Sequence, residues 1–123
     1  MPVKEGTSTA RPGPVLGVDR SEDATVVRLT GELDLYNAPE LRETLVGLAG
    51  ERPARLVLDL TEVEFVDSTA LGVLIEARSR MDDRKAFLLA APGFETRRAL
   101  KISGLDQHLT VHATLADALA AQL

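Results

Sequence analysis

Residues 64–74 read Glu64-Phe65-Val66-Asp67-Ser68-Thr69-Ala70-Leu71-Gly72-Val73-Leu74, and they predict a buried strand that ends where a helix begins. Ser68 stands at the expected N-cap, a position that Ser, Thr, Asp and Asn favour. Apolar residues then recur at helical spacing: Ala70, Val73, Leu74, Ala77 and Met81. A helix N-terminus carries unpaired N–H groups and a partial positive charge, so it would accept a phosphate on Ser68. Capping alone is the simpler role for such a serine.

The side of this helix that carries Ser68 is predicted to contact another chain. Each helical residue advances about 100° around the axis, so Gly72 shares the side of Ser68, opposite the apolar set. Leu71 and Ile75 also fall nearer to Ser68 than to that set, and we expect both to be exposed. Glycine inside a helix costs roughly 1 kcal/mol relative to alanine, and its place beside exposed Leu and Ile favours a closely approaching partner. The alternative is that Leu71 and Ile75 pack beneath a neighbouring helix or loop.

The composition predicts a single intracellular domain. A chain of 123 residues with 45% hydrophobic residues can bury its own core. The absence of cysteine excludes disulfides and thiolate metal sites. Aromatic residues make up only 3% and the net charge is -5, which argues against nucleic-acid binding. Apolar runs are too short for a membrane span or a signal peptide, so a cytoplasmic protein without membrane association is expected.

The order of predicted elements indicates an α/β fold. Residues 1–14 lack periodicity and are expected to form a disordered tail before a domain of residues 15–123. Strands are expected at residues 15–18, 24–30, 55–60, 86–90 and 108–111. Helices are expected at residues 37–50, 68–82, 94–102 and 115–123, the first with Asn37 and Glu40 in a capping box. A hairpin followed by strand–helix units predicts a mixed β-sheet of four to five strands, with helices mainly covering one face.

The sequence offers little for catalysis or metal binding. A serine nucleophile needs a nearby base, whereas His108 and His112 lie far along the chain and no Gly-x-Ser-x-Gly motif surrounds Ser68. The two histidines are four residues apart, a spacing that suits a metal pair only on a helix, and the residues between them predict a strand. No glycine loop typical of phosphate binding is present. We therefore expect no enzyme activity, no cofactor and no metal site.

Three motifs in the right order resemble one family. The run from Asp67 to Gly72 resembles the phosphorylation motif Asp-Ser-Ser/Thr-Gly/Ala-Leu-Gly of STAS-domain anti-sigma-factor antagonists. Gly31-Glu32-Leu33-Asp34 and Ile102-Ser103-Gly104-Leu105 resemble two further elements of that family, and the resemblance covers about residues 14–123. It implies a STAS fold, with Ser68 as the phosphoacceptor and the Asp34 loop on the partner-binding face. An ordinary turn aspartate is the alternative for Asp34.

The resemblance also implies a switch. The unphosphorylated chain would bind an anti-sigma factor that is a serine kinase, and this would free the sigma factor for transcription. Phosphorylation of Ser68 adds roughly -1.5 to -2 charges and would release the complex, and a serine phosphatase would reset it. The residues expected to contact the partner are Asp34, Asp67, Ser68, Thr69, Leu71, Gly72 and Ile75.

Two other functions remain open at this point. The first alternative is a STAS subunit, either of a sensory complex or of a lipid-transport ATPase, in which Ser68 is never phosphorylated. The second alternative is a small ligand-binding domain or enzyme. The sequence leaves open the partner kinase and its sigma factor, the stimulus, the oligomeric state and any phosphorylation of Thr69.

Overall fold

The computed structural model describes residues 13–123. Most of the expected tail, residues 1–12, lies outside the described residues, so its disorder stays a prediction. Pro14, which the sequence analysis places in that tail, is buried. Its carbonyl oxygen accepts a hydrogen bond of 2.9 Å from the Thr30 amide, so the folded part begins at least one residue earlier than expected.

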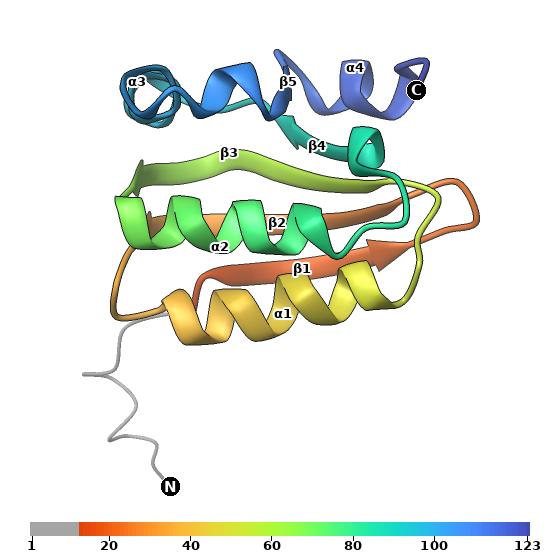
Figure 1. The fold of residues 1–123 in the computed structure, drawn as a ribbon, viewed down its shortest axis with the longest axis horizontal. Helices are drawn as coiled ribbons and strands as arrows, with labels where there is room; N and C mark the ends of the chain where they lie inside the picture. The colour runs from red at the N-terminus through yellow and green to blue at the C-terminus, as the bar shows by residue number, and fades with distance from the viewer. Residues whose placement is uncertain (1–12) are drawn as a thin grey trace, which may run out of the picture.

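Strands and helices alternate along the chain after an opening hairpin (Figure 1). The strands are β1 (Val15–Arg20), β2 (Thr25–Leu33), β3 (Leu56–Val66), β4 (Phe87–Ala90) and β5 (Thr110–His112). The helices are α1 (Ala38–Gly50), α2 (Ser68–Ser79), α3 (Phe94–Ser103) and α4 (Leu115–Ala120), with single 3₁₀ turns η2 (Arg84–Ala86) and η3 (Leu105–Gln107). Every predicted strand and helix is present, and the differences lie at their ends.

The described strands form one sheet in the order β1-β2-β3-β4-β5. β1 pairs with β2 antiparallel, and the other neighbouring pairs are parallel. The expectation of a mixed sheet is therefore confirmed. β3 lies at the centre, as its continuous apolar start predicts, because Leu56, Val57 and Leu58 are all fully buried between two covered faces.

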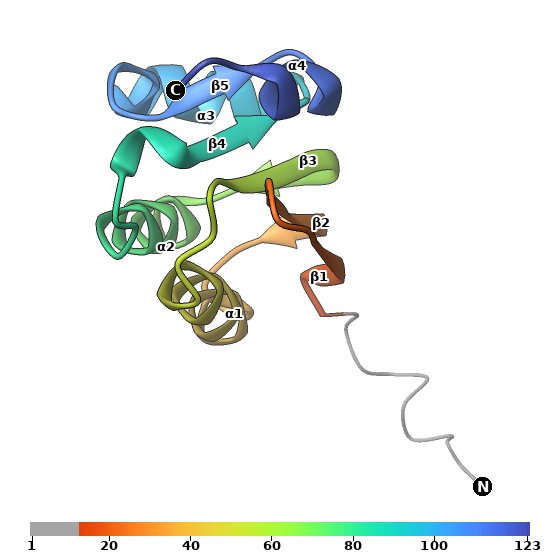
Figure 2. The same cartoon turned by 90° about the vertical axis from the view of Figure 1, so that its right-hand side faces the viewer.

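The helices divide unequally between the two faces of the sheet. Figure 2 shows α1 and α2 side by side on one face and α4 on the other. The larger apolar cluster lies on the α1–α2 side and includes Leu29, Leu58 and Phe87, while a smaller one joins Val57 and Leu88 to Ala118 of α4. This alternation along β3 and β4 follows the period of two of a strand. The prediction that helices mainly cover one face is confirmed.

Of the two C-terminal helices, α3 matches its expected range closely and α4 does not. In α3 the buried residues are Thr96 and Leu100, whereas Phe94 and Ile102 are 78% and 75% exposed. The last helix ends at Ala120, three residues earlier than expected, and buries Ala118 against the sheet. No helix within residues 13–123 is both long enough and apolar enough to cross a bilayer.

Candidate functional site

The candidate site forms where β2 and β3 end. These strands are parallel, with Leu33 opposite Val66, so their carboxyl ends meet at the same edge of the sheet. The loop after β2 and the start of α2 therefore lie side by side, at the left-hand end of the molecule in Figure 1. The Asp67 amide donates a hydrogen bond of 3.0 Å to the Leu33 carbonyl oxygen, which joins the two segments directly.

The N-cap of α2 is Asp67, and the prediction that Ser68 caps this helix is wrong. Asp67 has an extended backbone, and its Oδ1 accepts a hydrogen bond of 3.0 Å from the Ala70 amide. A carboxylate is favoured here because it also meets the positive end of the helix dipole. Ser68 is consequently the first helical residue, and both Ser68 and Thr69 are exposed. Their amides belong to the first turn, which has no carbonyl of its own helix to bond.

The Asp67 carboxylate also holds the neighbouring loop. Its second oxygen, Oδ2, accepts a hydrogen bond of 3.1 Å from the Leu35 amide. One side chain thus connects the start of α2 to the loop that follows β2. Asp67 is half-buried, as a group with contacts on both segments should be. The Asp34 loop therefore lies beside the Ser68 turn, and its place on a partner-binding face stays a prediction.

The loop itself is braced by its own polar side chains. Asp34 Oδ1 accepts a hydrogen bond of 3.0 Å from the Tyr36 amide. Asn37 Oδ1 accepts one of 2.9 Å from the Asp34 amide, and Asn37 Nδ2 donates one of 2.8 Å to the Glu32 carbonyl oxygen. Asp34 therefore bonds local backbone as a turn aspartate does, and its contact with a partner stays a prediction.

The predicted capping box of α1 is absent. Asn37 occupies the N-cap position but makes no capping hydrogen bond with its side chain. Its amide group turns back into the loop and bonds the backbone of Asp34 and Glu32 instead. Asn commonly bonds backbone that precedes a helix as well as backbone inside one. The sequence pattern alone could not separate these two uses.

The expected exposure of Leu71 is wrong. Leu71 is only 5% exposed and belongs to the main core cluster, while Ile75 is half-buried against it. The reason is that α2 lies beside α1 and also shares the main core cluster with residues of the strands, which widens its buried side. Gly72 is exposed as predicted, and a Cβ built there meets no atom within 4 Å. Nothing in the described part of this chain therefore requires glycine at residue 72.

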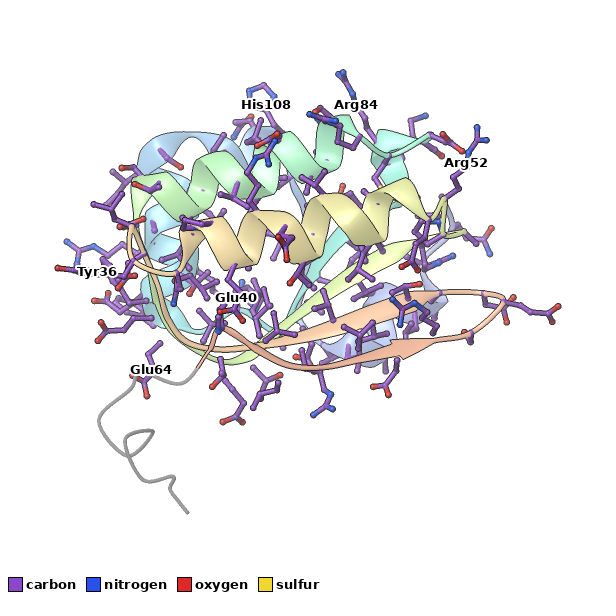
Figure 3. The ribbon with its side chains drawn as sticks, turned by 90° about the horizontal axis from the view of Figure 1, so that it is seen from below. Tyr36, Glu40, Arg52, Glu64, Arg84 and His108 are labelled. Carbon is purple, nitrogen blue, oxygen red and sulfur yellow. The ribbon has the colours of Figure 1, made fainter. Side chains whose placement is uncertain are left out.

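Two exposed residues were missed by the sequence analysis. Leu35 and Tyr36 are 67% and 83% exposed, and Figure 3 shows Tyr36 projecting from one end of the molecule, opposite the end that carries Arg52. The available signal was their position between two turn residues, Asp34 and Asn37, ahead of the first buried residue of α1. A pair of large apolar residues in such a turn has no core position to occupy.

An ion pair fixes α1 to α2 next to this surface. Arg42 Nε lies 2.7 Å from Glu76 Oε1, and Arg80 Nη2 lies 3.3 Å from Glu76 Oε2. The hydrogen bond from Arg42, with smaller contributions from the charges of Arg42 and Arg80, holds the pKa of Glu76 below its usual value. The pair thus favours the side-by-side arrangement of the two helices.

Glu76→Gln is expected to lower the free energy of unfolding slightly at neutral pH. It should also remove part of the loss of stability that the wild-type chain shows as the pH falls. Because the pKa of Glu76 is lowered in the fold, its contribution is present above the unfolded pKa of about 4.3. It disappears as the pH falls through the lower folded value. Both side chains are substantially exposed, so the effect is small and declines with salt. Urea unfolding of the wild type and the variant at pH 7 and pH 3 measures this difference in free energy of unfolding. An equal loss of stability at both pH values would contradict the prediction.

Known proteins resemble this chain both in sequence and in fold. The chain is 35% identical over 94 residues to the anti-sigma-F factor antagonist RsfB of Mycobacterium tuberculosis, which covers 76% of this chain and 77% of RsfB. A crystal structure of an anti-sigma factor antagonist from Mycobacterium paratuberculosis superposes with a TM-score of 0.78 at 33% identity, covering 85% of this chain and 89% of that one.

A more distant structural relative shares the fold. The anti-sigma factor antagonist SpoIIAA in its unphosphorylated form superposes with a TM-score of 0.69 at 20% identity, covering 84% of this chain and 91% of that one. Its phosphorylated form from Bacillus gives a TM-score of 0.62 over 84% and 95% of the two chains. Residues 16–118 match the STAS domain family, which is most of the described chain. This chain therefore belongs to the STAS domain family, and its relatives RsfB and the Mycobacterium paratuberculosis protein are anti-sigma factor antagonists.

Proposed function

We propose that this chain is an anti-sigma factor antagonist whose partner binding is controlled by phosphorylation of Ser68. The observation that carries the proposal is the exposed hydroxyl-bearing residue at the first position of α2, beside the braced loop of residues 34–37. The unphosphorylated chain binds an anti-sigma factor in the cytoplasm, and this releases the sigma factor. The names of its relatives support this class of partner.

The bound anti-sigma factor acts as a serine kinase in this proposal. It transfers the γ-phosphoryl group of ATP to Ser68 Oγ, so that a P–O bond forms there while the bond from the γ-phosphorus to the β–γ bridging oxygen breaks. ADP leaves, and the hydroxyl proton passes to a base on the kinase. This chain supplies the acceptor and the binding surface. A serine phosphatase hydrolyses the phosphoserine and restores the binding form.

The charge of the phosphate explains why the phosphorylated chain dissociates from the anti-sigma factor. The phosphate brings roughly -1.5 to -2 charges at pH 7. The unbonded amides and the positive dipole end of α2 accept that charge within the chain, so the fold tolerates it. A partner packed against Ser68 must strip water from the phosphate close to the carboxylates of Asp34 and Asp67. Repulsion and lost solvation then favour dissociation.

Ser68 serves as a phosphoacceptor in this account, and hydrolytic catalysis is disfavoured. A nucleophilic serine needs a base within hydrogen-bond reach. His108 and His112 flank and end β5, and β4 lies between β5 and β3 in the sheet. The end of β3 leads directly to Ser68, so the histidines belong to a different part of the molecule. Figure 3 places His108 away from the end that carries Tyr36.

The proposal is tested with the purified chain and each anti-sigma factor of the source organism. One anti-sigma factor is expected to bind the wild-type chain. Adding the chain should then restore transcription by the sigma factor that this anti-sigma factor inhibits. The same factor should transfer phosphate from ATP to the chain. Retention by no factor, together with no restored transcription, would contradict the proposal. Binding without phosphoryl transfer would favour a STAS subunit that lacks the switch.

Gly72→Ala is expected to raise stability and weaken partner binding. Alanine is favoured over glycine inside a helix by about 1 kcal/mol, and its Cβ meets no atom within 4 Å here. A partner that approaches the bare helix backbone would instead collide with that methyl group, and we expect a roughly tenfold higher Kd. Chemical unfolding and calorimetric titration measure the two effects.

Gly47→Ala provides the matched control for this pair of effects. Gly47 is an exposed residue inside α1, and a Cβ built there also meets no atom within 4 Å. Its substitution should raise stability by a similar amount and leave the Kd unchanged. If Gly72→Ala binds as tightly as Gly47→Ala, no chain approaches Gly72 closely.

A further inference from the structure

We propose that Leu35 and Tyr36 are the apolar anchor by which this chain is recognised, and that Asp67 is the positioning residue that presents them. The occupant of this surface is the anti-sigma factor, through an apolar recess that receives the two side chains. This inference rests on the proposed function and specifies its binding surface. It replaces the apolar contacts expected from Leu71, which is buried in the core.

Exposure is the first observation that carries the inference. Tyr36 is 83% exposed and Leu35 is 67% exposed, on consecutive residues of one loop. Large apolar side chains that stay in water are ordinary when scattered singly, but a contiguous pair next to a functional residue marks an interaction site. Tyrosine suits such a role because it offers a large ring at a low cost in conformational entropy. Binding energy at interfaces concentrates in a few residues of this kind.

Rigidity is the second observation. Four side-chain-to-backbone hydrogen bonds of 2.8–3.1 Å hold the backbone of residues 32–37 in one conformation. The bond from the Leu35 amide to Asp67 Oδ2 is the one that ties the loop to another element. A loop fixed before binding loses less conformational entropy when the partner arrives. The exposed pair is thus held ready in the free chain.

Proximity to the phosphoacceptor is the third observation. Asp67 precedes Ser68 and bonds both Ala70 of α2 and Leu35 of the loop. The anchor and the acceptor hydroxyl are therefore placed by the same carboxylate. A partner that buries Leu35 and Tyr36 must also cover or closely border Ser68. A phosphate at that point would lie at the border of an apolar contact, where a charge is costly to desolvate.

The first experiment compares exposed apolar residues at two places on the surface. Tyr36→Ala is expected to raise the Kd for the anti-sigma factor by about tenfold or more, and Leu35→Ala by severalfold. Phe94→Ala and Ile102→Ala are matched controls on α3, where the parent residues are 78% and 75% exposed. They should change the Kd by less than about twofold. The probe is the anti-sigma factor that retains the wild-type chain, with ADP in place of ATP so that no phosphate is transferred.

The second experiment separates positioning by Asp67 from helix capping. Asp67→Ser keeps a capping oxygen for α2 but has no second oxygen to reach the Leu35 amide. Thermal unfolding should therefore change little, while hydrogen exchange at the Leu35 amide becomes faster. The Kd should rise by about three- to tenfold because the anchor is less ordered before binding. Faster exchange with an unchanged Kd would show that the brace has no role in recognition.

The outcomes distinguish this inference from the function on which it rests. If the wild-type chain binds no anti-sigma factor, both the proposed function and this inference are contradicted. If the wild-type chain binds and Ser68→Glu does not, the function stands, and Tyr36→Ala with a wild-type Kd then overturns the inference alone. A loss of binding in Phe94→Ala or Ile102→Ala, with Tyr36→Ala unaffected, would move the anchor to α3.

Discussion

Ser68→Glu is expected to raise the Kd for the anti-sigma factor by roughly 30-fold to several thousandfold, with the fold intact. A desolvated charge without a partner at an interface costs about 2–5 kcal/mol, and that range sets the fold-change. Glutamate at the first position of α2 meets the positive helix end, so the free energy of unfolding should stay equal or rise by about 0.5 kcal/mol. Calorimetric titration and chemical unfolding of the same preparation give both quantities.

Ser79→Glu is the matched control for added charge on the same helix. Ser79 is exposed and ends α2, at the opposite end of the helix from Ser68. Its substitution adds the same charge to the chain but should leave the Kd within about twofold of the wild type, because long-range charge effects on an exposed surface are screened. If both variants lost binding equally, net charge rather than position would control the complex, and the switch at Ser68 would be contradicted.

Phe87→Ala is expected to lower the free energy of unfolding by about 3–5 kcal/mol. Phe87 begins β4, is 1% exposed and lies in the main core cluster on the α1–α2 side of the sheet. Removing its ring leaves a cavity in a close-packed interior, which adds to the lost transfer free energy. A domain of this size has about 5–15 kcal/mol of stability in total, so the variant should unfold well below the wild-type urea midpoint.

Phe94→Ala is the control for this prediction. Phe94 is 78% exposed at the start of α3, so its removal leaves no cavity and should change stability by less than about 0.5 kcal/mol. Urea unfolding followed by circular dichroism measures both variants. A loss of less than about 1 kcal/mol for Phe87→Ala would mean that the sheet does not pack against α1 and α2 as described.

The fold could be predicted from the sequence because its strongest signals are local. Residues 55–60 are too evenly apolar for an edge strand and predict a central one, and β3 does lie at the centre of the sheet. The Asp67–Gly72 motif predicted a strand-to-helix turn, and α2 begins at Ser68. In both cases the decisive residues are neighbours in the chain. Periodicity then suffices to assign the element.

The errors at the site have a common physical cause, which is competition between neighbouring groups for the same role. Asp67 and Ser68 are both good N-caps, and the carboxylate prevails because it bonds Ala70 and the Leu35 amide at once. Asn37 had a capping pattern but bonds loop backbone instead. Sequence spacing contains no information about which acceptor a nearby loop brings within reach. Such choices are made by tertiary contacts.

The misplaced Leu71 shows the limit of helical periodicity. A single amphipathic stripe assumes that a helix buries one side. α2 lies beside α1 and shares the main core cluster with residues of the strands, so residues at its border, such as Leu71, are also buried. The exposed apolar surface lies in the loop at Leu35 and Tyr36, where no periodicity applies. The partner-binding residues proposed here therefore combine a motif visible in the sequence with a loop visible only in the fold.

Peptide mass spectrometry of this chain, isolated from its native cells under growth and stress conditions, tests the central claim most directly. The account predicts a phosphate on Ser68 in one physiological state, and none on the Ser68→Ala variant in the same cells. It also predicts that the phosphorylated fraction is missing from material that copurifies with the anti-sigma factor. A Ser68 that stays unmodified under all conditions, or phosphorylated chain recovered in the complex, would contradict the switch.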